Sequence, residues 1–258
     1  MKLGLWVFLL CACVLLSHGQ PRGNFGDFKR SLNNTHYGYG LIEDPTHKGP
    51  SSKVEVFEVR SGDCGFHETW NDCLTDRERS ELTQVLKDTV AGDEYWYGWS
   101  IYFPKDFINL SPAKVSLGQF HQQASHPAWM FQHTREGYYL VNQLEQGRNH
   151  GFELIQESQL RGQWHQIEIQ VLWQTSQLGQ FNVWVNGQQK VNYVGPTMDA
   201  KQVYFKYGLY RAFLSRYLSQ RKIAKASKIS VPTQSVYFSN VKRGLVRKDL
   251  APLMNMAN

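Results

Sequence analysis

Short runs in which apolar and polar residues alternate constrain the fold of this chain more than any other feature. In residues 166–173, every second side chain from Ile167 onward is large and apolar. An extended backbone would therefore place these side chains on one face. A second run, residues 180–185, leads directly into Asn186-Gly187, a pair typical of two-residue hairpin turns. The pattern predicts paired antiparallel strands, each burying one face.

Runs of this kind recur along the chain, separated by Gly, Pro, Asn and Asp. Residues 74–87 could form a helix or a strand. Residues 212–234 are expected to form a long loop or lid, since Pro232 argues against one continuous helix. About ten strands with almost no helix predict an all-β fold, a concanavalin A-like β-jelly roll of two sheets. The expected strands are residues 53–60, 94–103, 113–122, 129–133, 138–144, 152–157, 163–175, 180–185, 189–194, 202–211 and 236–242.

The beginning of the chain resembles a secretory signal. Met1-Lys2 is followed by an apolar run over residues 3–16, and the small residues near Gly19 favour cleavage after it. No later run approaches the ~20 apolar residues of a membrane helix. We therefore expect a signal peptide over residues 1–19, a single β-jelly-roll domain over residues 20–258, and a secreted, extracellular protein.

Two of the four cysteines, Cys64 and Cys73, lie outside the expected signal. In an oxidising compartment this even pair predicts a disulfide that closes a small loop. The thiols could instead be free or bind a metal, although no second Cys pair or H-x-x-x-H partner completes a zinc site. No metal or other cofactor is expected. The nearby acidic residues match no calcium loop: Asp63, Asp72 and Asp76.

The net charge of +6 is unevenly distributed. A surface of one sign attracts polyanions and speeds their capture, although a solvated basic loop and tail would give the same pattern. Nucleic-acid binding is a weaker alternative, which the expected secretion contradicts. Residues 200–248 contain no Asp or Glu but twelve basic residues: Lys201, Lys206, Arg211, Arg216, Arg221, Lys222, Lys225, Lys228, Lys242, Arg243, Arg247 and Lys248.

Three segments combine residue types that suit proton transfer next to an anion: Arg79-Ser80-Glu81-Leu82, Gln119-Phe120-His121 and residues 204–211. On strands, side chains two apart share a face. Gly208 would let a sugar ring approach closely. The polar groove on this face is expected to be lined by three pairs and one further residue: Arg79 with Glu81, Gln119 with His121, Lys206 with Tyr210, and Tyr204. The opposite face of the last strand would fill the core: Val203, Phe205, Tyr207 and Leu209.

These residue types suit β-elimination from a uronic acid. The proton on carbon 5 can be removed once the neighbouring carboxylate is neutralised, and Arg79, Gln119 and His121 are suitable donors. Histidine, with an ordinary pKa of ~6.5, is a ready base, whereas tyrosine, at ~10, is a natural acid. For glucuronate or mannuronate, Tyr210 could serve as both base and acid. For guluronate or iduronate, His121 would be the base and Tyr210 the acid.

The three motifs R-S-E-L, Q-x-H and Y-F-K-x-G-x-Y together resemble those of jelly-roll polysaccharide lyases, which include alginate, glucuronan and heparin lyase I-like enzymes. The resemblance implies a lyase in which Arg79 and Gln119 hold and neutralise the carboxylate, and His121 neutralises it or acts as base. Tyr210 would be the acid or acid/base. The expected substrate-binding residues are Lys206, Glu81, Tyr204 and Arg211, with Lys206 and Glu81 binding or orienting.

Several alternatives remain at this point. Arg211-Ala212 stands where alginate lyases often have Asn-Gln, so the polymer stays open between glucuronan-, alginate- and heparin-like substrates. A jelly-roll glycoside hydrolase would need two suitably spaced carboxylates, which the sequence lacks. A non-catalytic glycan-binding module on the same fold is the second rival. The expected partner is an anionic polysaccharide, with no nucleic-acid or membrane partner and a monomeric state.

Overall fold

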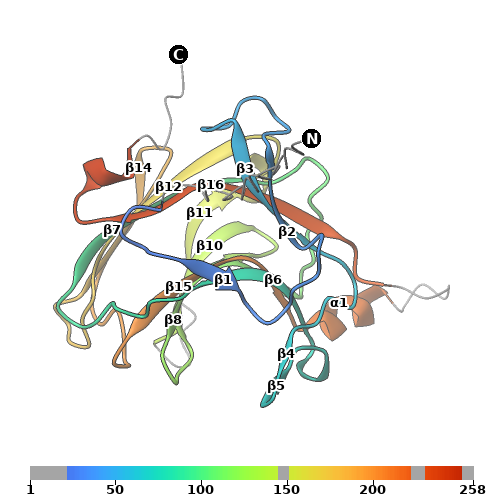
Figure 1. Cartoon of the computed structure of the whole chain (residues 1–258), viewed down its shortest axis with the longest axis horizontal. Helices are drawn as coiled ribbons and strands as arrows, with labels where there is room; N and C mark the ends of the chain where they lie inside the picture. The colour runs from blue at the N-terminus through green and yellow to red at the C-terminus, as the bar shows by residue number, and fades with distance from the viewer. Residues whose placement is uncertain (1–21, 145–150, 222–229, 252–258) are drawn as a thin grey trace, which may run out of the picture.

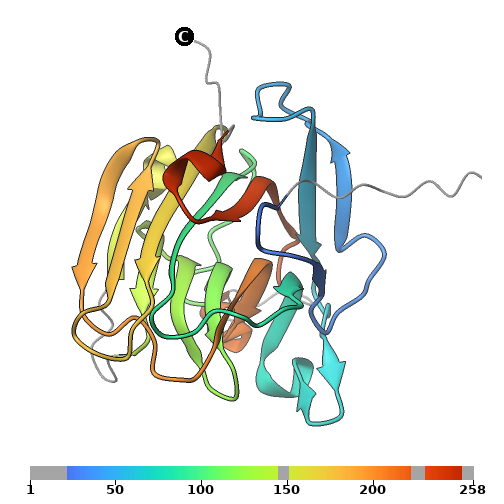
Figure 2. The same ribbon diagram turned by 60° about the vertical axis from the view of Figure 1, so that its left-hand side comes forward.

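Two large antiparallel sheets packed face to face make up the body of the protein (Figures 1 and 2). The computed structural model describes residues 22–144, 151–221 and 230–251. The seven strands of the front sheet follow the spatial order β1 (Phe28–Arg30), β6 (Arg77–Gln84), β15 (Val203–Ala212), β8 (Lys114–Gln122), β9 (Pro127–His133), β10 (Gly137–Asn142) and β11 (Gly151–Gln156).

The back sheet also has seven strands, in the order β14 (Gln188–Val194), β13 (Gln180–Val185), β12 (Trp164–Leu172), β7 (Glu94–Tyr102), β16 (Gln234–Gly244), β3 (Lys53–Val59) and β2 (Tyr39–Glu43). A small hairpin of β4 (Phe66–His67) and β5 (Trp70–Asn71) projects from the body beside the front sheet (Figures 1 and 2). The helical segments are η1 (Cys73–Thr75), η2 (Glu157–Gln159), α1 (Leu214–Arg221) and η3 (Arg247–Leu250).

The predicted all-β jelly roll of two sheets is confirmed, and each expected strand occurs within a few residues of its predicted ends. Four further strands, β1, β2, β4 and β5, have no counterpart in the prediction. Each is only two to five residues long, too short for alternation to stand out. None of the helices in the described ranges is long and apolar enough to cross a lipid bilayer.

Aromatic side chains from both sheets fill the space between them. Phe205 of β15 lies with its ring centroid 4.9 Å from that of Phe120 in β8 and 5.2 Å from that of Trp99 in β7. Burying a side chain of this kind stabilises the fold by about 1.5–3 kcal/mol. The four residues of β15 predicted to face the core are all buried: Val203, Phe205, Tyr207 and Leu209. Lys206 and Tyr210, at alternate positions of β15, therefore face outward.

Residues 77–84 form strand β6, which decides between the helix and the strand predicted for this region. The strand pairs with β1 on one side and with β15 on the other. These two ladders satisfy its backbone groups and outweigh a local preference for helix.

The loop predicted after β15 is wrong for residues 214–221, which form helix α1. Leu214 and Tyr217 lie three residues apart and are both buried in the core cluster. The carboxylate of Asp76 accepts hydrogen bonds from the backbone N–H of Ser215, at 2.9 Å, and from its hydroxyl, at 2.7 Å. This contact supplies an acceptor for the first turn of the helix. Residues 222–229 of the predicted lid lie outside the described residues.

Gly208 is required by the backbone, and not by a sugar ring as the sequence predicted. Between Tyr207 and Tyr210, β15 advances by three residues while β8 advances by two, so β15 carries a bulge here. Gly208 has a φ of +128°, and a Cβ at this position would lie 2.4 Å from the carbonyl oxygen of Ser80 and 2.7 Å from Cδ1 of Phe57. The missing side chain thus allows β6 and β3 to approach β15 closely.

Gly208→Ala should lower the free energy of unfolding by about 3–5 kcal/mol, because it combines backbone strain with overpacking. Gly92→Ala is the matched control. Gly92 also has a positive φ, of +101°, but a Cβ there would meet no atom within 4 Å. It should lose only about 1–2 kcal/mol. Denaturant unfolding of both variants checks the difference, and equal losses would contradict the steric explanation.

Candidate active site

The outward faces of β6, β15 and β8, together with the β4–β5 hairpin, line an open pocket of about 520 Å³. The strand register accounts for the grouping, since Tyr210 pairs with Arg79 across β15 and β6, and Lys206 pairs with Gln119 across β15 and β8. A larger hollow of about 650 Å³ lies beside β1, but no polar residue of the three predicted motifs lines it. Five predicted site residues line the 520 Å³ pocket: Arg79, Gln119, His121, Lys206 and Tyr210.

A buried carboxylate, Glu81, holds three of the polar side chains at the floor of this pocket. Gln119 donates from Nε2 to Oε1 at 2.6 Å, and Lys206 donates from Nζ to Oε2 at 2.9 Å. Arg79 donates from Nη1 to Oε2 at 3.2 Å. Burial alone would raise the pKa of Glu81, but the charges of Lys206 and Arg79 outweigh it and lower that pKa. Glu81 is therefore ionised at neutral pH.

The substrate-binding role predicted for Glu81 is wrong, and the orienting role fits the structure. Glu81 is only 1% exposed, and it does not line the pocket. Both of its oxygens already accept hydrogen bonds from the neighbouring donors. A substrate would meet those donors and not the carboxylate beneath them.

A second buried carboxylate, Asp72, fixes the orientation of Arg79. Arg79 donates from Nε to Oδ2 and from Nη2 to Oδ1, both at 2.6 Å, in the bidentate arrangement that suits guanidinium and carboxylate. Counting the bond to Glu81, three of the five N–H groups of Arg79 are used. Two remain, one on each Nη atom. Arg79 can therefore still donate twice to an anion in the pocket.

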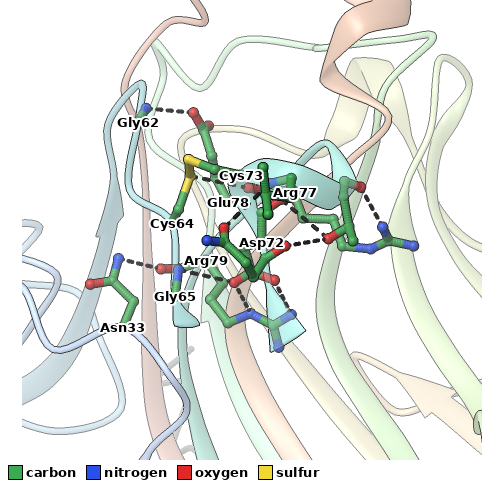
Figure 3. Close-up of a disulfide and its surroundings, with 12 residues drawn as sticks. Asn33, Gly62, Cys64, Gly65, Asp72, Cys73, Arg77, Glu78 and Arg79 are labelled. Atoms are coloured by element: carbon green, nitrogen blue, oxygen red, sulfur yellow. Dashed lines mark hydrogen bonds and ion pairs between the residues drawn. A yellow bond between two sulfur atoms is a disulfide. The ribbon is translucent and has the colours of Figure 1, made fainter. Parts of the chain in front are cut away.

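The predicted Cys64–Cys73 disulfide is present, with the two Cα atoms 5.3 Å apart, and it closes the loop that carries Asp72. Figure 3 shows Asp72 and the adjacent disulfide, with Asp72 directed at the guanidinium of Arg79. The backbone N–H of Gly65 donates to Oδ2 of Asp72 at 3.1 Å. The disulfide loop thus supplies one wall of the pocket and the anchor for its central arginine.

His121 is arranged as a neutral base. Its Nδ1 lies 2.9 Å from the carbonyl oxygen of Gln122, and because a carbonyl only accepts, Nδ1 must carry the hydrogen. Nε2 then keeps its lone pair. Burial, together with the charge of Lys206, lowers the pKa of His121 to about 4. The imidazole is neutral at neutral pH, which favours the predicted role as base over charge neutralisation.

Tyr204 contacts His121 and does not line the pocket, so its predicted substrate-binding role stays a prediction. The two rings stack with centroids 5.2 Å apart. The Tyr204 hydroxyl lies 3.2 Å from Nδ1 of His121, and Nζ of Lys87 lies 4.4 Å from the centre of the Tyr204 ring. These contacts fix the plane of the imidazole.

Tyr210 is arranged as an acid. Burial raises the pKa of its phenol, and the opposing charges of Arg79 and Arg77 do not cancel this effect. The phenol is therefore protonated at neutral pH. Its oxygen accepts a hydrogen bond from Nε of Arg77 at 2.6 Å, and the guanidinium carbon of Arg79 lies 4.5 Å from the ring centroid. The two cations can stabilise the phenolate that forms when the proton leaves.

Arg211 is not a substrate-binding residue, contrary to the prediction. Its side chain is 0% exposed because it belongs to the inward-facing set of β15. It forms an ion pair with Glu78, and it donates to the carbonyl oxygens of Pro232 at 2.6 Å and Arg60 at 3.0 Å. Its side chain lies in the interior, where it connects β6 to the segments around Arg60 and Pro232. It does not line the pocket.

The strongly basic surface predicted for residues 200–248 is also reduced in the structure. Acidic residues from other parts of the chain neutralise four of its cations, so these cations do not contribute to a surface of one sign. The pairs are Lys206 with Glu81, Arg211 with Glu78, Arg243 with Asp88, and Arg247 with Glu168.

Six residues that line the pocket have no role in the predicted site: Leu32, Trp70, Arg77, Ser125, His126 and Pro127. Asp72, buried beneath Arg79, has no role in it either. Arg77 lies two residues before Arg79 on β6, so the period of two could have identified it. Asp72 and Trp70 come from the disulfide loop, where no periodicity applies, and only the fold brings them to the pocket.

A family model described as polysaccharide lyase matches residues 23–242. No curated protein sequence matches the chain significantly. Among solved structures, the chain is similar to an endo-β-1,4-glucuronan lyase from the fungus Trichoderma reesei, with a TM-score of 0.57 and 18% identity over 88% of this chain and 100% of that one.

Two alginate lyases of family 7 also share the fold. The lyase A1-II′, solved with bound substrate, gives a TM-score of 0.56 and 12% identity over 84% of this chain and 91% of that one. The lyase AlgAT5 gives a TM-score of 0.51 and 13% identity over 84% of this chain and 92% of that one.

Asp72→Asn should reduce the free energy of unfolding by about 3–5 kcal/mol at neutral pH, because it leaves Arg79 buried with one of its two carboxylates removed. Although burial alone would raise the pKa of Asp72, Arg79 lowers it. The stabilisation is therefore present above the ordinary pKa of 3.8 and is lost as the pH falls through the lowered value.

Denaturant unfolding from neutral to acidic pH checks this prediction, with Asp106→Asn as the matched control because Asp106 is exposed. The difference between wild type and Asp72→Asn should shrink towards acidic pH. Equal stability of the two variants at neutral pH would contradict a stabilising Asp72–Arg79 pair.

Proposed function

The chain belongs to the polysaccharide lyase family, and on that premise we propose that it cleaves a uronate-containing acidic polysaccharide by β-elimination in the 520 Å³ pocket. One observation carries the proposal. A neutral imidazole with a free Nε2 and a protonated phenol line the same pocket as an arginine with two unused N–H groups.

The uronate carboxylate would lie against Arg79. The two remaining N–H groups of its guanidinium, and the second amide hydrogen of Gln119, are the donors available to it. Their orientation is fixed in advance by Asp72 and Glu81, so little reorganisation is needed when negative charge develops towards the carboxylate in the transition state. This is the condition under which the carbon 5 proton becomes acidic enough to remove.

His121 would then take the carbon 5 proton on Nε2, and the electron pair of that C–H bond would form the carbon 4–carbon 5 double bond. The bond from carbon 4 to the glycosidic oxygen breaks, and the phenol of Tyr210 gives its proton to the departing oxygen. The products are an unsaturated uronate and a new reducing end. A proton must then pass from His121 back to the Tyr210 phenolate, which Arg77 stabilises in the meantime.

The protonation states of the free enzyme, a neutral His121 and a protonated Tyr210, favour His121 as base with Tyr210 as acid over Tyr210 in both roles. A single tyrosine acting as base must first lose its proton, and the pKa of Tyr210 is raised. Two residues acting from opposite sides of the ring suit guluronate or iduronate, in which the proton and the leaving oxygen lie on opposite sides. Glucuronan, the polymer named for the fungal relative, would instead require Tyr210 to serve in both roles.

We further propose that the protein is secreted after removal of residues 1–19. The Cys64–Cys73 disulfide supports this, since such bonds persist in oxidising compartments. N-terminal sequencing of protein from the medium of a secreting host should begin at Gln20. Retention of the product inside cells with an intact N-terminus would contradict secretion.

The purified enzyme should generate the ultraviolet absorbance of an unsaturated uronate from at least one of three polymers: glucuronan, alginate and heparan sulfate. His121→Ala and Tyr210→Phe should each reduce kcat by about 10²–10⁴-fold with unchanged circular dichroism. His36→Ala and Tyr237→Phe, at an exposed histidine and at a tyrosine of the back sheet, should remain active. Near-normal turnover in either active-site variant would remove that residue from the mechanism.

The pH profile provides a separate test of the base. Because His121 must be neutral to accept a proton, kcat/KM should rise with pH through about 4 and then stay level across neutral pH. It should fall only above pH ~10, where the phenol of Tyr210 loses its proton. Unfolding followed over the same range separates acid denaturation from titration. An acid limb near 6.5 would contradict a buried His121 as the base.

A further inference from the structure

We propose that the disulfide loop carries a second sugar-binding subsite, in which the indole of Trp70 stacks on the pyranose ring next to the uronate held by Arg79. This inference rests on the proposed function, because it extends the substrate beyond the sugar that reacts. The ligand class is an acidic oligosaccharide with at least one sugar on the departing side of the cleaved bond.

Trp70 is the most exposed tryptophan in the described part of the chain, at 40%. A large apolar ring left in contact with water does not contribute the free energy that its burial would. In contrast, Trp99, Trp129 and Trp173 are completely buried between the sheets. Trp70 lines the same pocket as Arg79 and Tyr210. An exposed indole in a polar pocket is a surface on which the C–H face of a sugar can stack.

The ring of Trp70 is also held in place before any ligand arrives. Its Nε1–H donates to Oδ1 of Asp72 at 2.8 Å, and Trp70 pairs with His67 in the β4–β5 hairpin. The disulfide closes the same loop. A fixed side chain loses little conformational freedom on binding. Asp72 thus orients both the indole of Trp70 and the guanidinium of Arg79. The position of one group relative to the other is therefore fixed.

Contacts through Arg77 indicate which sugar would lie on the indole. The guanidinium carbon of Arg77 is 5.2 Å from the centroid of the Trp70 ring, and its Nε donates to the Tyr210 hydroxyl at 2.6 Å. Trp70 therefore lies on the side of Tyr210, the group that protonates the departing oxygen. The sugar that leaves with this oxygen is the one next to Trp70. Arg77 donates to Tyr210 and to the carbonyl of Thr75, so its charge remains available to an acid group on that sugar.

The first experiment measures kcat and KM on the polymer that wild type cleaves. Trp70→Ala should raise KM about tenfold and affect kcat less, whereas Trp70→Phe should recover most of the loss because it keeps an aromatic face. Phe66→Ala is the matched control, since Phe66 lies in the same hairpin, is 76% exposed and does not line the pocket. If Trp70→Phe is as impaired as Trp70→Ala, the bond to Asp72 matters and stacking does not, which would overturn the proposal.

A binding experiment separates this inference from the proposed function. In a Tyr210→Phe background, tetrasaccharides of glucuronan and of alginate and a heparan sulfate tetrasaccharide are titrated while tryptophan fluorescence is recorded. Binding should shift the emission, and the shift should disappear in the double variant with Trp70→Phe. Binding with that signature but no turnover by wild type would overturn only the elimination chemistry. Turnover by wild type with no Trp70-dependent shift would overturn only the subsite, and neither binding nor turnover would overturn both.

Discussion

Two carboxylates with almost no access to water, Glu81 and Asp72, determine how the polar face of the front sheet is arranged. An ionised carboxylate is costly to bury unless cations and hydrogen-bond donors surround it. Here that requirement draws Arg79, Lys206 and Gln119 into one cluster. The donors at the pocket floor are consequently fixed by contacts beneath them before any substrate binds.

Strand β15 connects this cluster to the stability of the whole domain. Its inward residues join the aromatic core, while Lys206 and Tyr210 face the pocket from the alternate positions. The bulge at Gly208 lies between these two pocket residues and depends on close approach to Ser80 and Phe57. Changes in the packing between the sheets would therefore move Tyr210 relative to Lys206. The positions of the pocket residues on β15 therefore depend on how the core is packed.

A period of two residues was sufficient to predict the strands and the outward row of the site, because both depend only on local backbone geometry. The same period places Arg211 with the core residues of β15 and places Arg77 on the same face as Arg79. Position along the strand therefore predicts both residues better than their charge does. Burial of Glu81 and the approach of Asp72 could not be predicted in this way. Burial of Glu81 depends on donors from β8 and β15, 38 and 125 residues away. The approach of Asp72 to Arg79 depends on the path of the disulfide loop, where no alternation applies.

Charge pairing in the pocket also limits what can attract the substrate. Arg79 and Lys206 carry two positive charges, and Asp72 and Glu81 carry two negative ones, so this cluster adds little net field. Of the pocket cations, Arg77 instead donates to a phenol and a carbonyl oxygen. Recognition of a uronate would then depend on donor geometry at short range more than on the long-range attraction of a basic surface. Such donor geometry would favour a carboxylate held at the correct angle over other polyanions that merely carry charge.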